Sequence, residues 1–81
     1  MCIICIKPQG TTITALVWDR LKESFNSNPD GGGFMWTDGS DVHIRKGFMN
    51  WIDFESAIYT YELHRYKGVI VFHTRIGTHG A

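Results

Sequence analysis

An unbroken apolar run over residues 69–72 constrains the fold of this chain most. It consists of Val69, Ile70, Val71 and Phe72. Four consecutive apolar residues have the length of a strand, and the lack of alternation predicts a strand that is covered on both faces. The segment that follows it, residues 73–79, is then expected to lie at the end of this strand.

The first half of the chain predicts one strand and one helix. Ile3, Ile4 and Ile6 form a β-branched run that ends at a turn signal after residue 7, so we expect a strand over 2–7. Thr11 or Thr12 can cap a helix that ends in a loop over 26–33. The apolar positions of this helix recur at helical spacing and are Ile13, Leu16, Val17, Leu21 and Phe25.

The second half predicts a hairpin, a second helix and the last strand. Residues 34–37 and 41–46 alternate as strands and are joined by turn-forming residues. Asn50 and Asp53 are amino-terminal signals of a helix. Its apolar face consists of Trp51, Phe54, Ile58 and Tyr61. The order β-α-β-β-α-β, without repeat or linker, predicts a single α+β domain.

Size and charge limit the possible functions. A chain of 81 residues buries only about 60–65% of its unfolded surface, so its core is small. Eight basic residues balance eight acidic ones, which disfavours nucleic acid and membrane surfaces as partners. No apolar run approaches the ~20 residues of a membrane span, and the start lacks the features of a signal peptide. We therefore expect a cytoplasmic protein whose cysteines are free thiols.

Cys2 is the first candidate catalytic residue. A small second residue permits removal of Met1, which leaves a thiol and a free α-amine on one residue. The amine titrates near ~8 and the thiol near ~8.5, so the amine can accept the thiol proton. The plain alternative is that Cys2 is an ordinary strand residue.

Two further motifs accompany Cys2. One is Asn28-Pro29-Asp30-Gly31-Gly32-Gly33, and the other is His73-Thr74-Arg75-Ile76-Gly77-Thr78-His79-Gly80. With Met1-Cys2, and in this order along the chain, they resemble the amino-terminal part of a class II glutamine amidotransferase domain, an N-terminal-nucleophile hydrolase. The resemblance implies a partial α-β-β-α sandwich of two antiparallel sheets over residues 1–81. It also implies hydrolysis of glutamine, or of a glutamine-like amide, by Cys2 through a thioester and without a cofactor.

The resemblance assigns roles to residues outside the amino terminus. Arg75 is expected to bind the substrate α-carboxylate with its guanidinium fork. By the same resemblance, Thr78 and His79 are expected to contact this group, and Asp30, Gly31, Gly32 and Gly33 are expected to shape the pocket. The alternatives are a surface ion pair for Arg75 and a tight turn for the glycines. A phosphate-binding loop is disfavoured, because the lysine of such a loop is missing here.

A metal site is a further alternative. Cys2 and Cys5 have the spacing of half a zinc site, and His64, His73 and His79 are possible additional ligands. Residues three apart on a strand point to opposite faces, so Cys5 is expected to face away from Cys2 and pack as a small hydrophobe. We therefore expect no metal.

The motifs leave the catalytic set incomplete. The family's oxyanion donors are an Asn-Gly pair downstream of the closing block, and the chain contains no such pair up to Ala81. We therefore expect a truncated or split domain that self-associates or needs a complementing polypeptide. Two other functions remain open: a non-catalytic remnant that binds a partner or a glutamine-like ligand, and a γ-glutamyl amide hydrolase on the same scaffold.

Overall fold

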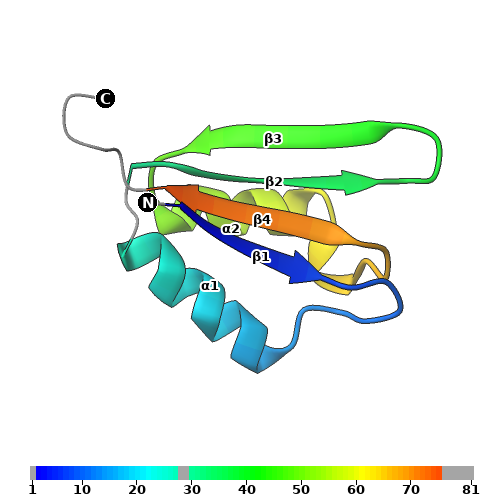
Figure 1. Cartoon of the computed structure of the whole chain (residues 1–81), viewed down its shortest axis with the longest axis horizontal. Coiled ribbons are helices and arrows are strands. Elements are labelled where there is room, and N and C mark those ends of the chain that lie inside the picture. Colours follow the sequence, from blue (N-terminus) through cyan, green and yellow to red (C-terminus); the bar gives the residue numbers. More distant parts are fainter. Residues whose placement is uncertain (1, 28–29, 76–81) are drawn as a thin grey trace.

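A computed structural model describes residues 2–27 and 30–75, with the backbone alone at Cys2. It confirms an α+β chain with the predicted order of strands and helices (Figure 1). One short 3₁₀ helix, η1, was not predicted. The elements are β1 (Cys2–Lys7), α1 (Ala15–Ser27), β2 (Gly32–Thr37), β3 (Val42–Phe48), α2 (Trp51–Thr60), η1 (Leu63–Arg65) and β4 (Ile70–Arg75).

The four strands form one antiparallel sheet in the order β1-β4-β2-β3. Because β4 inserts between β1 and β2, these two strands run in the same direction, and α1 connects them across β4. In the same way α2 connects β3 to β4 across β2. The starts of β1 and β2 therefore lie at the same end of the sheet as the ends of β3 and β4 (Figure 1). We call this the site end.

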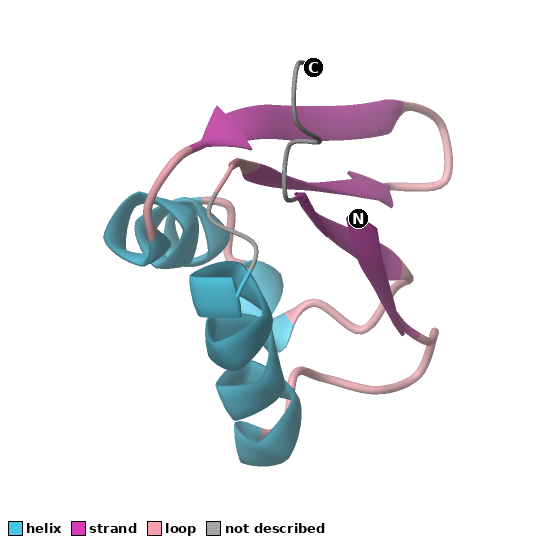
Figure 2. Cartoon of the chain, turned by 60° about the vertical axis from the view of Figure 1, so that its left-hand side comes forward, coloured by secondary structure: helices cyan, strands magenta, loops and turns pink. Residues whose placement is uncertain are grey.

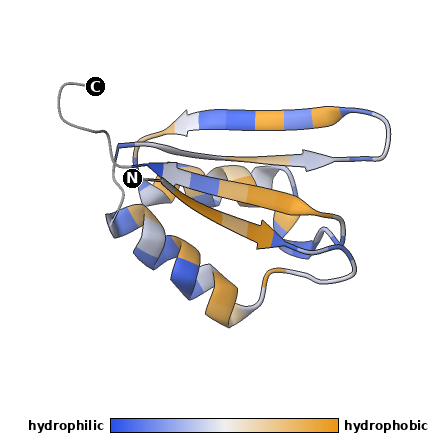
Figure 3. Ribbon diagram, in the orientation of Figure 1, coloured by the Kyte–Doolittle hydropathy of each residue, from blue (hydrophilic) through white to orange (hydrophobic). Residues whose placement is uncertain are grey.

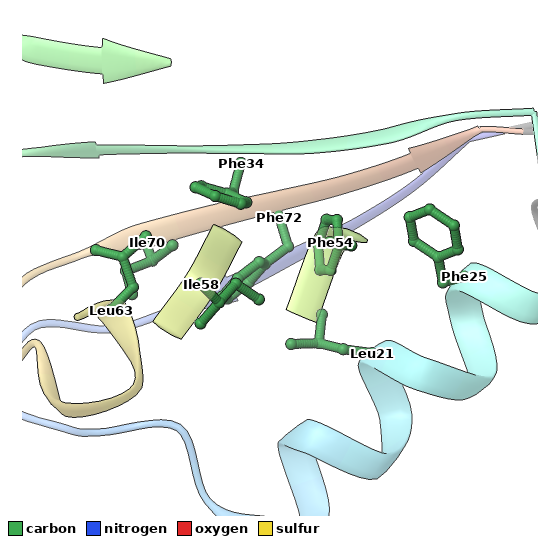
Figure 4. Close-up of a cluster of buried hydrophobic side chains, with 8 residues drawn as sticks. All are labelled: Leu21, Phe25, Phe34, Phe54, Ile58, Leu63, Ile70 and Phe72. Carbon is green, nitrogen blue, oxygen red and sulfur yellow. The ribbon is translucent and has the colours of Figure 1, made fainter. Parts of the chain in front are cut away.

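Both helices pack on one face of the sheet, which we call the covered face (Figure 2). The opposite face, which we call the open face, carries no element of the described chain. The expected second sheet of a sandwich is therefore not seen among residues 2–27 and 30–75. The covered face holds the core, which consists of Leu21, Phe25, Phe34, Phe54, Ile58, Leu63, Ile70 and Phe72 (Figure 4).

Phe54 on α2 lies at the centre of this core. Its side chain is 0% exposed, and its ring centroid lies 5.1–6.3 Å from those of five other aromatic rings in the described chain. Burying one such side chain stabilises the fold by about 1.5–3 kcal/mol. A few large aromatic side chains thus hold both helices on the sheet.

The bounds and burial of β4 differ from the prediction made from the apolar run. The strand covers Ile70–Arg75, so the closing block begins inside the strand and not after it. Its buried positions are Ile70, Phe72 and Thr74. Val71 is only half-buried, and His73 and Arg75 are exposed. The expectation of a strand covered on both faces was wrong, because both helices pack on the same side.

The start of α1 also differs from the prediction. The Thr11 hydroxyl donates to the Pro8 carbonyl in the preceding turn and does not cap the helix. The Thr14 hydroxyl accepts from the Val17 N–H instead, at 3.2 Å. Leu16, predicted to be on the apolar face, is 66% exposed. The helix packs through Val17, Trp18, Leu21 and Phe25.

The start of α2 is confirmed. The Asn50 side chain accepts a hydrogen bond from the Asp53 N–H at 2.9 Å, which is the predicted cap. Tyr61 was predicted to be on the apolar face, but it follows the helix as its carboxy-terminal cap and is exposed. Its hydroxyl accepts from Arg45 Nε at 2.8 Å, which holds the ring over β3.

Lys7 is a polar exception on the covered face. It pairs with Ile70 and is only 2% exposed. Its ammonium donates to the carbonyl oxygens of Pro8 and Thr11, which closes the turn after β1. Burial lowers the pKa of this lysine, because the charged form loses water that the two carbonyls replace only in part.

Candidate functional site

The pairing of β1 with β4 places Cys2 opposite Arg75. Residues opposite each other in an antiparallel pair have Cα atoms about 4.5–5.5 Å apart. The predicted nucleophile and the predicted carboxylate-binding residue, 73 positions apart in the sequence, are therefore neighbours at the site end.

The glycine motif joins the same place. The Asp30 N–H donates to the Arg75 carbonyl at 2.9 Å, and the Arg75 N–H donates to the Gly31 carbonyl at 2.9 Å. These two bonds continue the pairing of β2 and β4 beyond Gly32. Three motifs that are separate in the sequence thus meet at one end of one sheet. Thr78 and His79, the other predicted substrate contacts, lie outside the described residues.

Gly32 and Gly33 belong to β2, not to the predicted loop. A Cβ atom on Gly32 would lie 2.5 Å from the Phe25 ring, and one on Gly33 would lie 2.7 Å from the Arg45 carbonyl oxygen. Both glycines are therefore required by packing. Gly31 differs, because its φ of +126° is a conformation that side-chain-bearing residues rarely adopt.

A concavity of about 360 Å³ opens at the site end of the open face. Gly33 pairs with His73 on one side and with Lys46 on the other, so the missing side chain leaves room between them. The lining is mixed: apolar side chains and backbone lie beside cationic groups. The residues that matter here are Met35, Lys46, Met49, Val71, His73 and Arg75.

The charges of the concavity favour an anionic ligand. Lys46 and Arg75 both line it and are exposed. Neither forms an ion pair within residues 2–27 and 30–75. A carboxylate that enters the concavity therefore meets these two cations, while the Asp30 carboxylate, which also lines it, lowers the net positive charge.

Cys5 lies on the other side of β1 from this concavity. It pairs with Phe72 and packs, half-buried, against the core, as predicted. Burial raises the pKa of its thiol, so less of the reactive thiolate is present at neutral pH. In the described part of the chain, no three His, Cys, Asp or Glu residues gather closely enough to hold a metal ion.

Sequence reasoning missed Lys46 and Met49. Lys46 was only one member of an alternating strand, and Met49 was part of no motif. The signal for Lys46 was available in the hairpin, because pairing outward from the turn at 38–41 brings Lys46 opposite Gly33. Reaching that pair required knowing that β2 begins at Gly32, because a strand that begins at residue 34, as predicted, stops short of Gly33.

Comparison with known proteins gives no relative from which a role could be transferred. No protein-family model, no curated protein and no solved structure matches this chain. None of the helices in the described residues is long and apolar enough to span a membrane. The candidate site therefore rests on the geometry of its own residues, above all on the pairing of Cys2 with Arg75.

Proposed function

We propose that this chain carries the nucleophile and the substrate-binding arginine of a glutamine amidotransferase or glutaminase. The observation that carries the proposal is the register of β1 and β4, which makes Cys2 and Arg75 direct neighbours. An amide hydrolase for an amino acid needs a nucleophile and an α-carboxylate clamp within the length of one small substrate. Neighbouring strands satisfy that requirement.

The concavity fits a substrate of this class. Its volume of about 360 Å³ is at the small end of the usual range for ligand pockets, roughly 300–1,000 Å³. Arg75 can hold a carboxylate with two parallel hydrogen bonds, and Lys46 adds a second positive charge. Met35 and Val71 offer apolar contact to the methylene groups of a glutamine side chain.

The proposed reaction uses the α-amine of Cys2 as base once Met1 is removed. The thiol proton passes to the amine while sulfur attacks the side-chain carboxamide carbon, which gives a tetrahedral intermediate. The same proton then goes to the leaving nitrogen, and the C–N bond breaks to release ammonia and leave a thioester. Water then attacks the thioester while the amine takes its proton, the C–S bond breaks to form glutamate, and the proton passes to the leaving sulfur, which regenerates the free thiol.

Oxyanion stabilisation must come from elsewhere in this proposal. Loss of one oxyanion donor typically costs about a hundredfold to a thousandfold in rate. The family's Asn-Gly pair has no counterpart in the sequence. We therefore propose that the sheet forms one half of an α-β-β-α sandwich and that donors outside these 81 residues complete the site.

Selective labelling of Cys2 tests the assignment. A diazo-ketone analogue of glutamine should react with Cys2 and spare Cys5, because the Cys5 thiol is packed against the core and its pKa is raised by burial. Intact mass first establishes that Met1 is absent, and peptide mapping then locates the label. Cys5→Ala should label like the wild type, and Cys2→Ala should not label. Equal labelling of both thiols would show that Cys2 is not the nucleophile.

Arg75→Lys tests the carboxylate clamp. The substitution keeps the charge but loses the planar fork, so we expect glutamine to bind at least about tenfold more weakly. Calorimetry measures the affinity for glutamine, on protein to which the residues that complete the site have been supplied. Arg65→Lys is the matched control, because Arg65 is exposed on η1 and pairs with Glu62 instead. Unchanged affinity in Arg75→Lys would remove Arg75 from the site.

A further inference from the structure

An apolar stripe crosses all four strands of the open face. Val71 is paired with Ile6 on one side and with Met35 on the other, and Met35 is paired in turn with Ile44. The stripe therefore consists of Ile6, Val71, Met35 and Ile44, in that order across the sheet. Ile6 is 63% and Ile44 is 55% exposed. Figure 3 shows the hydrophobic residues of β1 and β4 and the alternation along β3.

The stripe continues beyond this row. Ile4 lies two residues from Ile6 on β1 and on the same face, and Val42 lies at the start of β3; both are largely exposed. Four strands of about six residues give a face of roughly 400 Å² in projection, before side-chain relief is counted. The apolar stripe occupies part of this face, and Lys46, His73 and Arg75 lie toward its site end. Contiguous exposed apolar patches of a few hundred Å² often mark an interaction site.

The charges at the two ends of β3 are opposite. Lys46 lies toward the site end, whereas the turn between β2 and β3 carries Asp38 and Asp41. The Asp38 carboxylate accepts hydrogen bonds from the N–H groups of Asp41 and Ser40 and is hydrogen-bonded to the His43 ring. These contacts hold its pKa well below the usual range. The turn is therefore negative at neutral pH.

This distribution is complementary to itself. If a second copy is turned by 180° about an axis along the stripe, apolar stripe meets apolar stripe and β3 lies over β3 in the opposite direction. Lys46 of each copy then lies opposite Val42 of the other, next to Asp41 of the acidic turn. A two-fold interface requires a surface that matches itself in this way, so that both contacts form twice.

We propose that the open face binds a second copy of this chain, sheet against sheet, with the strands of the two copies antiparallel. Contact between the two faces buries at least about 800 Å² of surface, counted in projection. The side chains that project from the sheets raise the buried surface toward the roughly 1,200 Å² at which specific interfaces begin. The dimer should therefore dissociate on dilution, with a dissociation constant of about micromolar order. In this arrangement the partner copy walls the concavity at the site end.

Sedimentation velocity across a dilution series tests the dimer. The wild-type chain should move from 9.3 kDa toward twice that mass as the concentration rises. Ile44→Glu should raise the dissociation constant at least about tenfold, because it puts a charge into the stripe. Ile52→Glu is the matched control, since Ile52 is 72% exposed on α2, away from the sheet. Ile44→Thr, which keeps strand propensity, should weaken the dimer less.

A charge reversal tests the antiparallel arrangement. Lys46→Glu and Asp41→Lys should each weaken the dimer, and the double variant should recover most of the loss, because the two reversed charges face each other again across the interface. Asp41 is chosen over Asp38 because the Asp38 carboxylate holds the turn.

The outcomes separate cleanly. The proposal would be overturned if the wild-type chain stays at 9.3 kDa at the highest concentration reached. It would also be overturned if Ile44→Glu and Ile52→Glu weaken the dimer equally. A double reversal without recovery would overturn the arrangement. The dimer and the proposed sandwich both cover the open face, whose Met35, Lys46 and Val71 also line the concavity, so the two proposals share residues. The mass measurement still tests the dimer alone, because it involves neither Cys2 nor glutamine.

Discussion

The two faces of the sheet have similar apolar content but different surroundings. On the covered face, Phe34, Ile70 and Phe72 are buried by side chains from α1 and α2. On the open face, Ile6 and Ile44 are exposed for more than half of their surface. The same kind of strand residue is thus core on one side and accessible surface on the other.

An apolar pattern along a strand therefore indicates that a face tends to be buried, but it does not specify which element or partner buries it. In this chain both connections that carry helices, β1 to β2 and β3 to β4, place their helices on one side (Figure 2). The open face is then left to a ligand, a second chain or solvent. Matched substitutions on the two faces measure how far they differ.

The largest difference is expected between two isoleucine truncations. Ile58→Ala removes a side chain that is 0% exposed and leaves a cavity, which should lower the free energy of unfolding by about 2–5 kcal/mol. Ile44→Ala makes the same chemical change at a residue that is 55% exposed and should cost less than about 1 kcal/mol. Urea denaturation of both variants, at the lowest workable protein concentration, gives the two values.

Low concentration matters because association through the open face would add to the apparent stability contributed by Ile44. If both truncations cost the same in dilute protein, the two faces do not differ as described.

An intermediate effect is expected at Gly33, where the open face is also closely packed. Gly33→Ala would bring Cβ to 2.7 Å from the Arg45 carbonyl oxygen, so β3 must shift. We expect a loss of about 1–3 kcal/mol in the free energy of unfolding. Thermal denaturation followed by circular dichroism measures it. Met35→Ala, two positions along the same strand face, is the control and should cost less. A neutral Gly33→Ala would mean that the two strands do not approach so closely.

The smallest effect is expected from two lysines. Lys7→Ala removes a 2% exposed ammonium that bonds two carbonyls, but it also removes the cost of burying a charge, so the net loss should be about 1 kcal/mol. Lys46→Ala on the open face should change the monomer by less than about 0.5 kcal/mol. Equal effects of the two changes would contradict the burial of Lys7.

The sign of the pH dependence provides a second test of Lys7. Its pKa is lowered in the folded state, so the unfolded chain binds more protons in the range between the folded value and the ordinary value near about 10.4. The wild type should therefore gain stability relative to Lys7→Met as pH rises through this range. Denaturation of both proteins at a series of alkaline pH values checks this, and a relative loss would show that the ammonium is stabilised by the fold.

Local signals in the sequence predicted the elements well where a few neighbouring residues decide them. β1 has the predicted bounds, and Asn50 caps α2 as predicted. The predicted start of α1 was wrong, because threonine is a good cap at several positions here. Thr14 caps the helix, whereas the Thr11 hydroxyl donates a hydrogen bond within the turn after β1. Such a choice depends on contacts that no local pattern contains.

Short-range periodicity, caps and turn residues were sufficient to predict the α+β class and the order of the strands and helices, and the residue types that can attack an amide and hold a carboxylate were visible in the sequence. The position of β4 between β1 and β2 could be known only from the folded chain. This position makes Cys2 and Arg75 neighbours and lets Gly31 accept a hydrogen bond from Arg75. The tertiary structure alone also decided which face remains open, because strand pairing and helix packing depend on contacts between residues far apart in the chain.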